Sequence, residues 1–320
     1  MSRITAVSDD EQKAHFCREK VDHVTGDEET TAFKKKARLH QSLWREARNL
    51  PIGHQPMRRS PDRKSRPLGS RVELEYAHKH GCNFLTDSAL AAARCRLANP
   101  EPHQTLDADR LWCDLLSSMP MCFNLFGELF NDHVLADRAV HAWWPDVPGR
   151  VSAVRFEWSP GRALKGEYLE NRSAFDVAFE LVLDDGSRGV LGVETKYHED
   201  CKREKEPSDD RLRRYEYVSA SSGLLAPKSV KEIIGTDLQQ IWLDHLLAAS
   251  MPFHDSGKWA WAGFALVHPA LNPSYVRATS RYRELLEPGA SIRVSTVESL
   301  LAADVLPRAA SEAFSVRYLW

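Results

Sequence analysis

Two short motifs decide the fold of this chain: Phe175-Asp176-Val177 and, eighteen residues after the aspartate, Glu194-Thr195-Lys196. The sequence between them reads as two strands joined at Asp184-Asp185-Gly186-Ser187. The turn signal is strong because an Asp-Gly pair tolerates the positive φ that tight hairpins require. Residues two apart in a strand point to the same face, so the glutamate and the lysine are expected to emerge together. The sequence therefore predicts a β-hairpin with an aspartate at the start of one strand and a glutamate and a lysine at the end of its partner.

The length of the turn determines whether the two acids share a face of the sheet. A two-residue loop at Asp185-Gly186 would pair Asp176 with Thr195, and the aspartate would then lie on the opposite face from Glu194. An odd-length loop or a β-bulge would bring Asp176, Glu194 and Lys196 to one side. Bulges are common beside active sites because they re-aim a side chain. We therefore expect a bulge in this hairpin.

Two carboxylates and a lysine over a sheet suit the metal-assisted cleavage of a phosphodiester bond. Mg²⁺ takes oxygen ligands, typically one or two carboxylates together with substrate phosphate and water, and Asp176 and Glu194 can supply them. The metal polarises the phosphoryl group and lowers the pKa of a bound water. Lys196 would orient that water or stabilise the charge that develops on the phosphate. The expected cofactor is therefore Mg²⁺, with Mn²⁺ as a possible substitute.

With these residues in place, the chain resembles the PD-(D/E)XK nuclease superfamily, whose core runs helix, three-strand meander, crossing helix, strand. The resemblance covers roughly residues 70 to 305, and several phrases resemble, more narrowly, a group of bacterial restriction-type endonucleases. Where that pattern has proline before the aspartate, this chain has Phe175. The other matching phrases are Phe123-Asn-Leu-Phe126, Glu194-Thr-Lys-Tyr-His-Glu199, Gln240-Ile-Trp-Leu-Asp-His-Leu-Leu247 and Val267-His-Pro-Ala-Leu-Asn-Pro273.

The resemblance implies an α/β protein with a restriction-endonuclease-like core that hydrolyses DNA, as an endonuclease. It also implies a catalytic role for Gln240, because many members of the superfamily place a glutamine on the crossing helix. Two alternatives stay open. The domain could bind nucleic acid or a protein partner without catalysis, or it could act on RNA, since the core chemistry does not involve the 2′-hydroxyl. A homodimer is also possible.

The N-terminal part of the chain is strongly basic. Twelve lysines and arginines but only two acids, Glu46 and Asp62, lie between Lys34 and Arg71. Such a cluster could contact a phosphate backbone, or it could be a solvated linker, as Pro51, Pro56, Pro61 and Pro67 suggest. We expect residues 1–69 to form a basic, partly flexible helical extension and residues 70–320 to form the nuclease domain.

The pattern along the rest of the chain predicts the elements of that domain. A helix over 122–139 would be the first core helix. Strands are expected over 152–158, 173–183, 190–197 and 259–268. The crossing helix is expected to begin near Thr236 with a capping box between Thr236 and Gln239.

Several other polar residues are weaker candidates. Glu128, Glu167 and Glu199 could add a carboxylate to a metal site, although a surface position is the simpler interpretation of each. His245 lies on the apolar stripe of the crossing helix and is expected to be a core histidine.

Bulk composition sets the remaining limits. The chain has 320 residues, 42% of them hydrophobic and 28% charged, which is ordinary for a globular protein. No apolar run approaches the roughly 20 residues of a membrane span, and no export signal is apparent. The six cysteines show no C-x-x-C pair and are expected to be reduced thiols in the cytoplasm. Phosphate-binding-loop, serine-elbow and H-E-x-x-H motifs are missing from the sequence.

Overall fold

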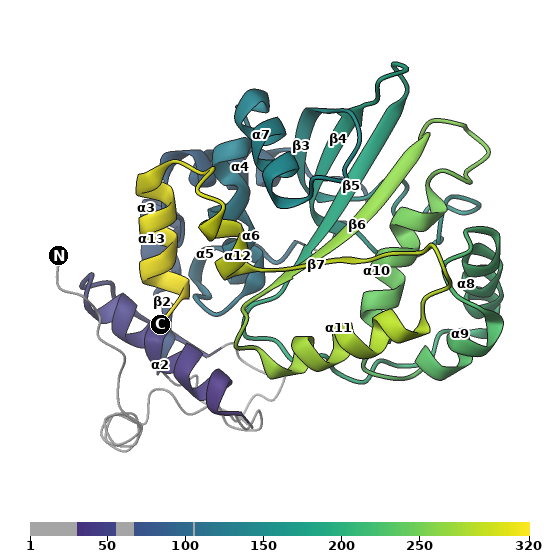
Figure 1. The fold of residues 1–320 in the computed structure, drawn as a ribbon. Coiled ribbons are helices and arrows are strands. Elements are labelled where there is room, and N and C mark those ends of the chain that lie inside the picture. Colours follow the sequence, from purple (N-terminus) through teal and green to yellow (C-terminus); the bar gives the residue numbers. More distant parts are fainter. Residues whose placement is uncertain (1–30, 56–66, 105) are drawn as a thin grey trace.

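A mixed five-stranded sheet is the centre of the molecule (Figure 1). The computed structural model describes residues 31–55, 67–104 and 106–320. In the strand order β3-β4-β5-β6-β7, the first three strands form an antiparallel meander, and β6 and β7 follow β5 in parallel. The strands are β3 Arg150–Trp158, β4 Phe175–Val182, β5 Arg188–Thr195, β6 Trp261–His268 and β7 Arg293–Thr296. This arrangement confirms the predicted α/β class and the order of meander, crossing helix and strand.

The β4–β5 hairpin has an odd-length loop and an unbroken register. Val182 pairs with Arg188, and Leu183 and Ser187 continue the pairing through a 2.9 Å hydrogen bond. The three-residue loop between them contains Gly186 at φ 82°, a conformation that glycine adopts without steric cost. The pairing runs from Val182 back to Val177 without a register shift. The expectation of a bulge was therefore wrong, since the odd loop alone sets this register.

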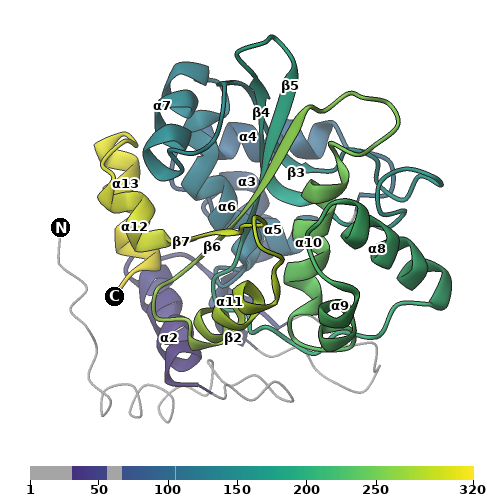
Figure 2. The ribbon, with the colours of Figure 1, turned by 45° about the vertical axis from the view of Figure 1, so that its right-hand side comes forward.

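Helices cover both faces of the sheet, and each face has its own apolar core (Figures 1 and 2). On one face Phe123 and Phe126 pack against Phe156 and Phe179. On the other face Trp242 and Phe264 lie in the second core. The helices of the first face are α4 Asp87–Ala98, α6 Ser118–Phe126 and α7 His133–Trp143, with α12 Val297–Ala302 and α13 Arg308–Tyr318 beside them. The helices of the second face are α8 Asp209–Ser221, α9 Pro227–Ile233, α10 Gln239–Ser250 and α11 Pro273–Leu285.

The expected first core helix over 122–139 is broken into two. The 3₁₀ turn η1 Gly127–Leu129 separates α6 from α7. A Cβ atom on Gly127 would lie 2.5 Å from Ala89 Cα, so the chain passes α4 at a distance that only glycine permits. Asp132 then starts α7 by accepting a hydrogen bond from the backbone N–H of Leu135.

The crossing helix is α10, and it begins at Gln239, later than predicted. The expected capping box is absent because Thr236 Oγ1 donates to the carbonyl of Ile233 and accepts from the N–H of Leu238. The side chain of Gln239 binds the N–H of Gly235 instead. His245 is buried in the second core, as predicted, where its Nδ1 lies 3.2 Å from the Tyr282 hydroxyl.

The N-terminal helix α2 Ala32–Glu46 packs on the rest of the protein (Figures 1 and 2). Phe33 and Trp44 are buried, and Gln41 donates hydrogen bonds to the Tyr197 hydroxyl and to the carbonyl of Arg317. The strand β2 Pro67–Val72, which crosses the expected boundary at residue 69, pairs with β1 Ile52–His54. Within the described ranges, the helix is thus a packed part of the fold. The basic residues Arg58, Arg59, Arg63, Lys64 and Arg66 lie outside the described residues.

The remaining helices of the described ranges are short: α3 Leu74–His80 and α5 Ala108–Cys113. Among the helices of the described ranges, none has the length and apolar character of a bilayer-spanning segment.

Candidate functional site

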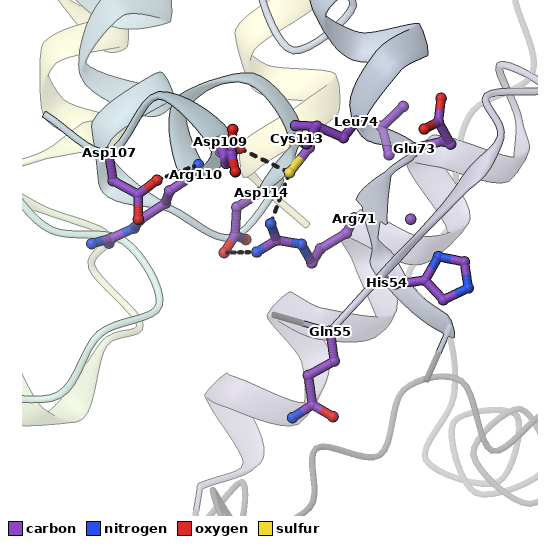
Figure 3. Close-up of a pocket in the computed structure, with 12 residues that line it drawn as sticks. His54, Gln55, Arg71, Glu73, Leu74, Asp107, Asp109, Arg110, Cys113 and Asp114 are labelled. Carbon is purple, nitrogen blue, oxygen red and sulfur yellow. Dashed lines mark hydrogen bonds and ion pairs between the residues drawn. The ribbon is translucent and has the colours of Figure 1, made fainter. Parts of the chain in front are cut away.

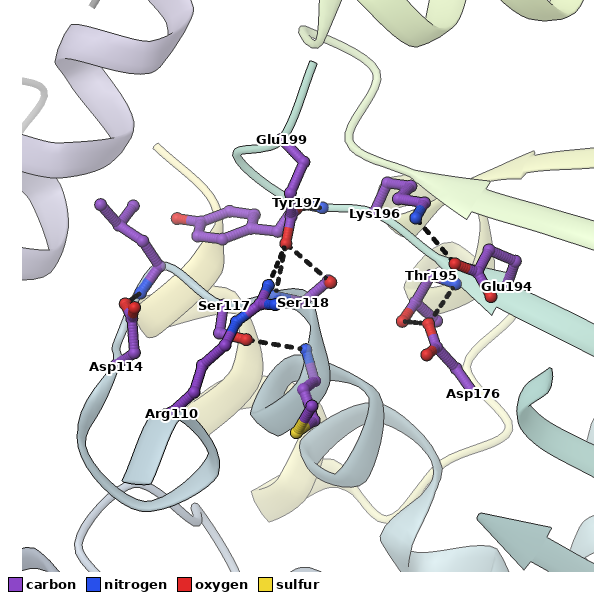
Figure 4. Close-up of polar contacts among 12 residues, drawn as sticks. Arg110, Asp114, Ser117, Ser118, Asp176, Glu194, Thr195, Lys196, Tyr197 and Glu199 are labelled. Carbon is purple, nitrogen blue, oxygen red and sulfur yellow. Dashed lines mark hydrogen bonds and ion pairs between the residues drawn. The ribbon is translucent and has the colours of Figure 1, made fainter. Parts of the chain in front are cut away.

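The motif residues meet in a cavity of about 530 Å³ at the open end of the β4–β5 hairpin, away from its turn. Asp176 lies at the start of β4, and Glu194 and Lys196 lie at and just beyond the end of β5 (Figure 4). Gln240, in the first turn of α10, also lines the cavity and is partly buried. The structure thus brings all four predicted site residues together.

Glu194 and Lys196 form an ion pair, with Lys196 Nζ 2.7 Å from Glu194 Oε1. Both side chains are about nine-tenths buried. Burial lowers the pKa of Lys196, but Glu194 and nearby acids raise it by more. The pKa of Lys196 therefore lies well above its ordinary value. Burial and the charge of Asp176 raise the pKa of Glu194 well above its ordinary value. Lys196 is therefore an ammonium group that is fixed beside a carboxylate.

Asp176 reaches the cavity through a change in the facing of β4. Phe175 packs in the second core, where its ring would contact a Cβ on Gly192 at 2.4 Å, whereas Val177 belongs to the first core. A regular strand would place these two residues on one face, so the strand turns over at Asp176. The Asp176 carboxylate accepts hydrogen bonds from the N–H and the hydroxyl of Thr195, at 2.8 and 2.6 Å. The carboxylate of Asp176 is therefore held by Thr195, whereas the carboxylate of Glu194 is held by its ion pair with Lys196.

Burial raises the pKa of Asp176 above its ordinary value, although Lys196 and the hydrogen bonds from Thr195 oppose the shift. Asp176 raises the pKa of Glu194, and Lys196 lowers it. Because Asp176 raises the pKa of Glu194 and Glu199 raises that of Asp176, the ionisation of all these acids together needs additional positive charge in the cavity.

Glu157, near the end of β3, also lines the cavity, and sequence analysis missed it. Burial and then Asp176 raise the pKa of Glu157 to about 7. The residue could not be identified from the sequence because residues 159–174, which connect β3 to β4, have no regular structure and hide the pairing of these strands.

Asp244 is a second acid that the sequence analysis missed. It is buried on α10, and burial raises the pKa of Asp244 to about 7 while Lys196 opposes the shift. The signal that could have identified it is its spacing, because Asp244 follows Gln240 by four residues and shares its face of the helix.

Glu199 holds the segment after β5 in place (Figure 4). Its Oε1 accepts hydrogen bonds from Arg110 at 3.0 Å and from the N–H and hydroxyl of Ser118 at 3.1 and 2.8 Å. Its Oε2 accepts one from the N–H of Tyr197 at 2.9 Å. Burial raises the pKa of Glu199, but Arg110, Lys196 and these hydrogen bonds lower it below its ordinary value. Glu199 therefore joins the chain that carries Lys196 to the N-terminus of α6.

The profile of the PD-(D/E)XK nuclease superfamily matches residues 27–320 of this sequence. The chain belongs to the PD-(D/E)XK nuclease superfamily. No curated protein and no solved structure matches it. The match begins before α2, so it includes the N-terminal helix that the sequence analysis had placed in an extension.

A second cavity lies beside the one that holds the PD-(D/E)XK motif. It has a volume of about 750 Å³ and shares Arg110 with the motif cavity (Figure 3). One ion pair lies within its lining, between Arg71 and Asp114 at 3.1 Å, and Arg71 also donates to Cys113 Sγ at 2.8 Å. None of the four predicted site residues lines it, so the candidate nuclease site is the smaller cavity.

Two of the weaker candidates lie away from the motif cavity. Glu128 accepts a hydrogen bond from the Ser88 hydroxyl at 3.3 Å, and Glu167 pairs with His254 at 2.7 Å. Neither lines the cavity.

The donor set of the motif cavity fits a hard divalent cation. Among the described residues, no group of three or more histidine, cysteine, aspartate or glutamate side chains is arranged to hold a metal by itself. Mg²⁺ does not require such a group, because it commonly binds through one or two carboxylates together with waters and substrate phosphate. The described lining contains six carboxylates and four lysine or arginine side chains, so a cation would also balance its charge. Asp176 and Glu194 are the residues that would hold it.

Proposed function

We propose that this protein is a metal-dependent nuclease that hydrolyses DNA phosphodiester bonds as an endonuclease. Asp176 and Glu194 would hold Mg²⁺, and Lys196 would assist the attacking water. One observation carries the proposal: Asp176, Glu194 and Lys196 line a single cavity in a chain that belongs to a nuclease superfamily.

The charge of the cavity supports dependence on a metal. A phosphodiester is an anion, and it would enter a cavity in which carboxylates outnumber lysines and arginines. A bound Mg²⁺ would supply Lewis-acid polarisation of the phosphate and a more acidic water. Asp176 and Glu194 would keep that charge at the end of the hairpin, where Thr195 and Lys196 fix the orientation of their carboxylates.

Lys196 would act as a donor of hydrogen bonds and positive charge. Its raised pKa keeps it protonated at neutral pH, so it cannot accept the proton of the attacking water. The ion pair with Glu194 and the hydrogen bond from its own N–H to the carbonyl of Val267 hold the residue at the cavity wall. From there the ammonium group would orient the water and stabilise the charge that develops on the phosphate.

Gln240 would contact the substrate or the water. Its amide has both donors and an acceptor, and it lines the cavity from the crossing helix, opposite the strand residues. It carries no charge, so it would add orientation without changing the electrostatic balance.

The proposal is tested by incubating the purified protein with supercoiled plasmid, linear duplex DNA and RNA, with Mg²⁺, with Mn²⁺ and with EDTA. Nicking or linearisation of the closed plasmid in the presence of metal is expected, and EDTA is expected to abolish it. Asp176→Asn, Glu194→Gln and Lys196→Gln should each reduce cleavage by about 100-fold or more while the circular dichroism spectrum is retained. Cleavage of RNA alone would overturn the assignment of DNA, and full activity of any of the three variants would overturn the site.

A further inference from the structure

Lys202 is a residue of the motif cavity to which the proposed function gives no role. It follows the motif by six residues, in the segment 201–208 that leads to α8 and has no regular secondary structure. Lys202 lines the cavity and is also exposed, so it lies at the cavity rim. Its ammonium group is therefore accessible to a molecule that enters the cavity.

The other lysine and arginine side chains of the cavity each pair with an acid. The pairs are Lys34–Asp200 at 2.9 Å, Arg110–Glu199 at 3.0 Å and Lys196–Glu194 at 2.7 Å. To bind a further anion, each of these cations would have to share or lose its carboxylate. Their charge is thus largely used within the protein.

Lys202 differs from these three cations. Within the part of the chain that the structure describes, its ammonium group has no hydrogen bond or ion pair. Glu204, two residues further on, also lines the cavity, yet no ion pair joins the two side chains. An ammonium group without a carboxylate partner keeps its net charge and its three hydrogen-bond donors. In the described lining, Lys202 can therefore bind an incoming anion without the loss of an existing ion pair.

The main chain around Lys202 is held at both sides although it has no regular structure. The N–H of Cys201 donates to Ser274 Oγ at 2.9 Å, in the first turn of α11. On the other side, Gln239 Nε2 at the start of α10 donates to the carbonyl of Lys205 at 2.9 Å. Binding of an anion by Lys202 would therefore order one side chain and not a whole segment, which lowers the entropic cost.

The position of Lys202 distinguishes its role from that of Lys196. Lys196 is about nine-tenths buried and is paired with Glu194, one of the two proposed metal ligands. It would thus act on the scissile phosphate. Lys202 lies at the exposed rim, where the neighbouring phosphate of the same strand would pass. Because acids outnumber lysines and arginines in the described lining, that phosphate needs an unpaired cation to offset repulsion.

We propose that Lys202 binds a phosphate of the DNA backbone next to the scissile phosphate. This inference rests on the proposed nuclease function. Lys202 is then a positioning residue: it holds the strand at the rim while Asp176, Glu194 and Lys196 act on the phosphodiester inside the cavity.

The first test is the affinity of the full-length protein for a fluorescent duplex DNA. It is measured by anisotropy over a range of salt concentrations, in Ca²⁺, which takes oxygen ligands as Mg²⁺ does. Lys202→Gln should lower the slope of log affinity against log salt by about 0.9, whereas Lys202→Arg should keep it. Lys205→Gln is the matched control, because it removes the same charge from an exposed position of the same segment outside the cavity lining. It should leave the slope unchanged.

The second test is cleavage of duplex DNA by the same proteins in Mg²⁺. Lys202→Gln should raise KM by about tenfold, the value of one charge-assisted hydrogen bond, and leave kcat within about twofold. Lys202→Arg should restore most of the loss. Thermal unfolding curves check the folding of each variant.

Three outcomes would overturn the inference. If the wild type cuts DNA and Lys202→Gln keeps its salt slope and KM, Lys202 is not a phosphate contact and the nuclease proposal stands. Equal effects of Lys202→Gln and Lys205→Gln would show that only the overall charge of the segment matters. A wild type that neither binds nor cuts duplex DNA would overturn the proposed function, and the role of Lys202 with it.

Discussion

At the scale of single residues, several buried acidic side chains surround one lysine. Asp176, Glu194 and Asp244 all raise the pKa of Lys196, and the pKa of each of these acids is raised in turn. Such an arrangement is costly for the protein without a cation. It suits a site in which a bound cation would balance the excess negative charge.

Glu157 makes this cost measurable as a dependence of stability on pH. Its pKa is about 7 in the folded chain, above the ordinary value of 4.5, so the folded state holds a proton that the unfolded state has lost. The contribution to stability is therefore fully present below about pH 4.5 and is lost as the pH rises through about 7. In EDTA at pH 8, Glu157→Gln is expected to raise the melting temperature by a few degrees.

The same measurement at pH 4 is the control, because Glu157 is then protonated in the folded state and mostly protonated in the unfolded state, so the difference between variant and wild type should nearly vanish. A variant that melts below the wild type at pH 8 would contradict the raised pKa of Glu157.

At the scale of elements, the site depends on the reversal of facing in β4. The reversal in β4 needs room for the Phe175 ring over β5, and Gly192 provides it, since a Cβ there would lie 2.4 Å from the ring. Gly189, in the same strand, has more tolerant surroundings, because its nearest obstacle is the tip of the Leu183 side chain at 3.1 Å. Both glycines are buried.

We therefore expect Gly192→Ala to displace Phe175 and with it the adjacent Asp176. The free energy of unfolding should fall by about 1–3 kcal/mol, and metal-dependent cleavage should fall further than Gly189→Ala lowers it. Chemical denaturation and plasmid cleavage of the two variants check this. The double variant Gly192→Ala/Phe175→Ala should regain part of the activity if the clash with the ring is the cause. Equal effects of the two single glycine variants would show that the position of Phe175 is not critical.

At the scale of the whole molecule, the N-terminal helix closes the fold. Gln41 of α2 bonds to Tyr197, directly after Lys196, and to Arg317 in the last helix. Lys34 pairs with Asp200 at 2.9 Å at the rim of the motif cavity. The helix thus contacts segments more than 150 residues away in the sequence.

Removing residues 1–50 is therefore expected to expose apolar surface and to destabilise the nuclease domain, because Phe33 and Trp44 lose their burial. The truncated protein should show a lower melting temperature or aggregate, which size-exclusion chromatography and calorimetry would detect. A soluble truncated protein with an unchanged melting temperature would restore the interpretation of this region as a separate extension.

The basic character of the same helix is tested separately from its packing. Lys35 is exposed, so Lys35→Gln should leave the melting temperature unchanged. If Lys35 contacts a DNA phosphate, the substitution should lower the slope of log affinity against log salt by about 0.9. An unchanged slope would remove this residue from the DNA contacts.

The sequence by itself determined the hairpin, the meander and the chemical types at its end. These features depend on local signals: an Asp-Gly turn, apolar strands and the spacing of Glu194 and Lys196. Such features are predictable because neighbouring residues in the chain fix them. Gln240 was indicated by the resemblance to the nuclease superfamily and not by a local signal.

Only the tertiary structure decided which further residues join the site. Glu157 enters because β3 pairs with β4 across an irregular connection. The break at Gly127 follows from contact with α4, and the place of α2 follows from contacts with Tyr197 and Arg317. These are long-range packing and hydrogen-bonding interactions, and a single sequence contains no local signal for them.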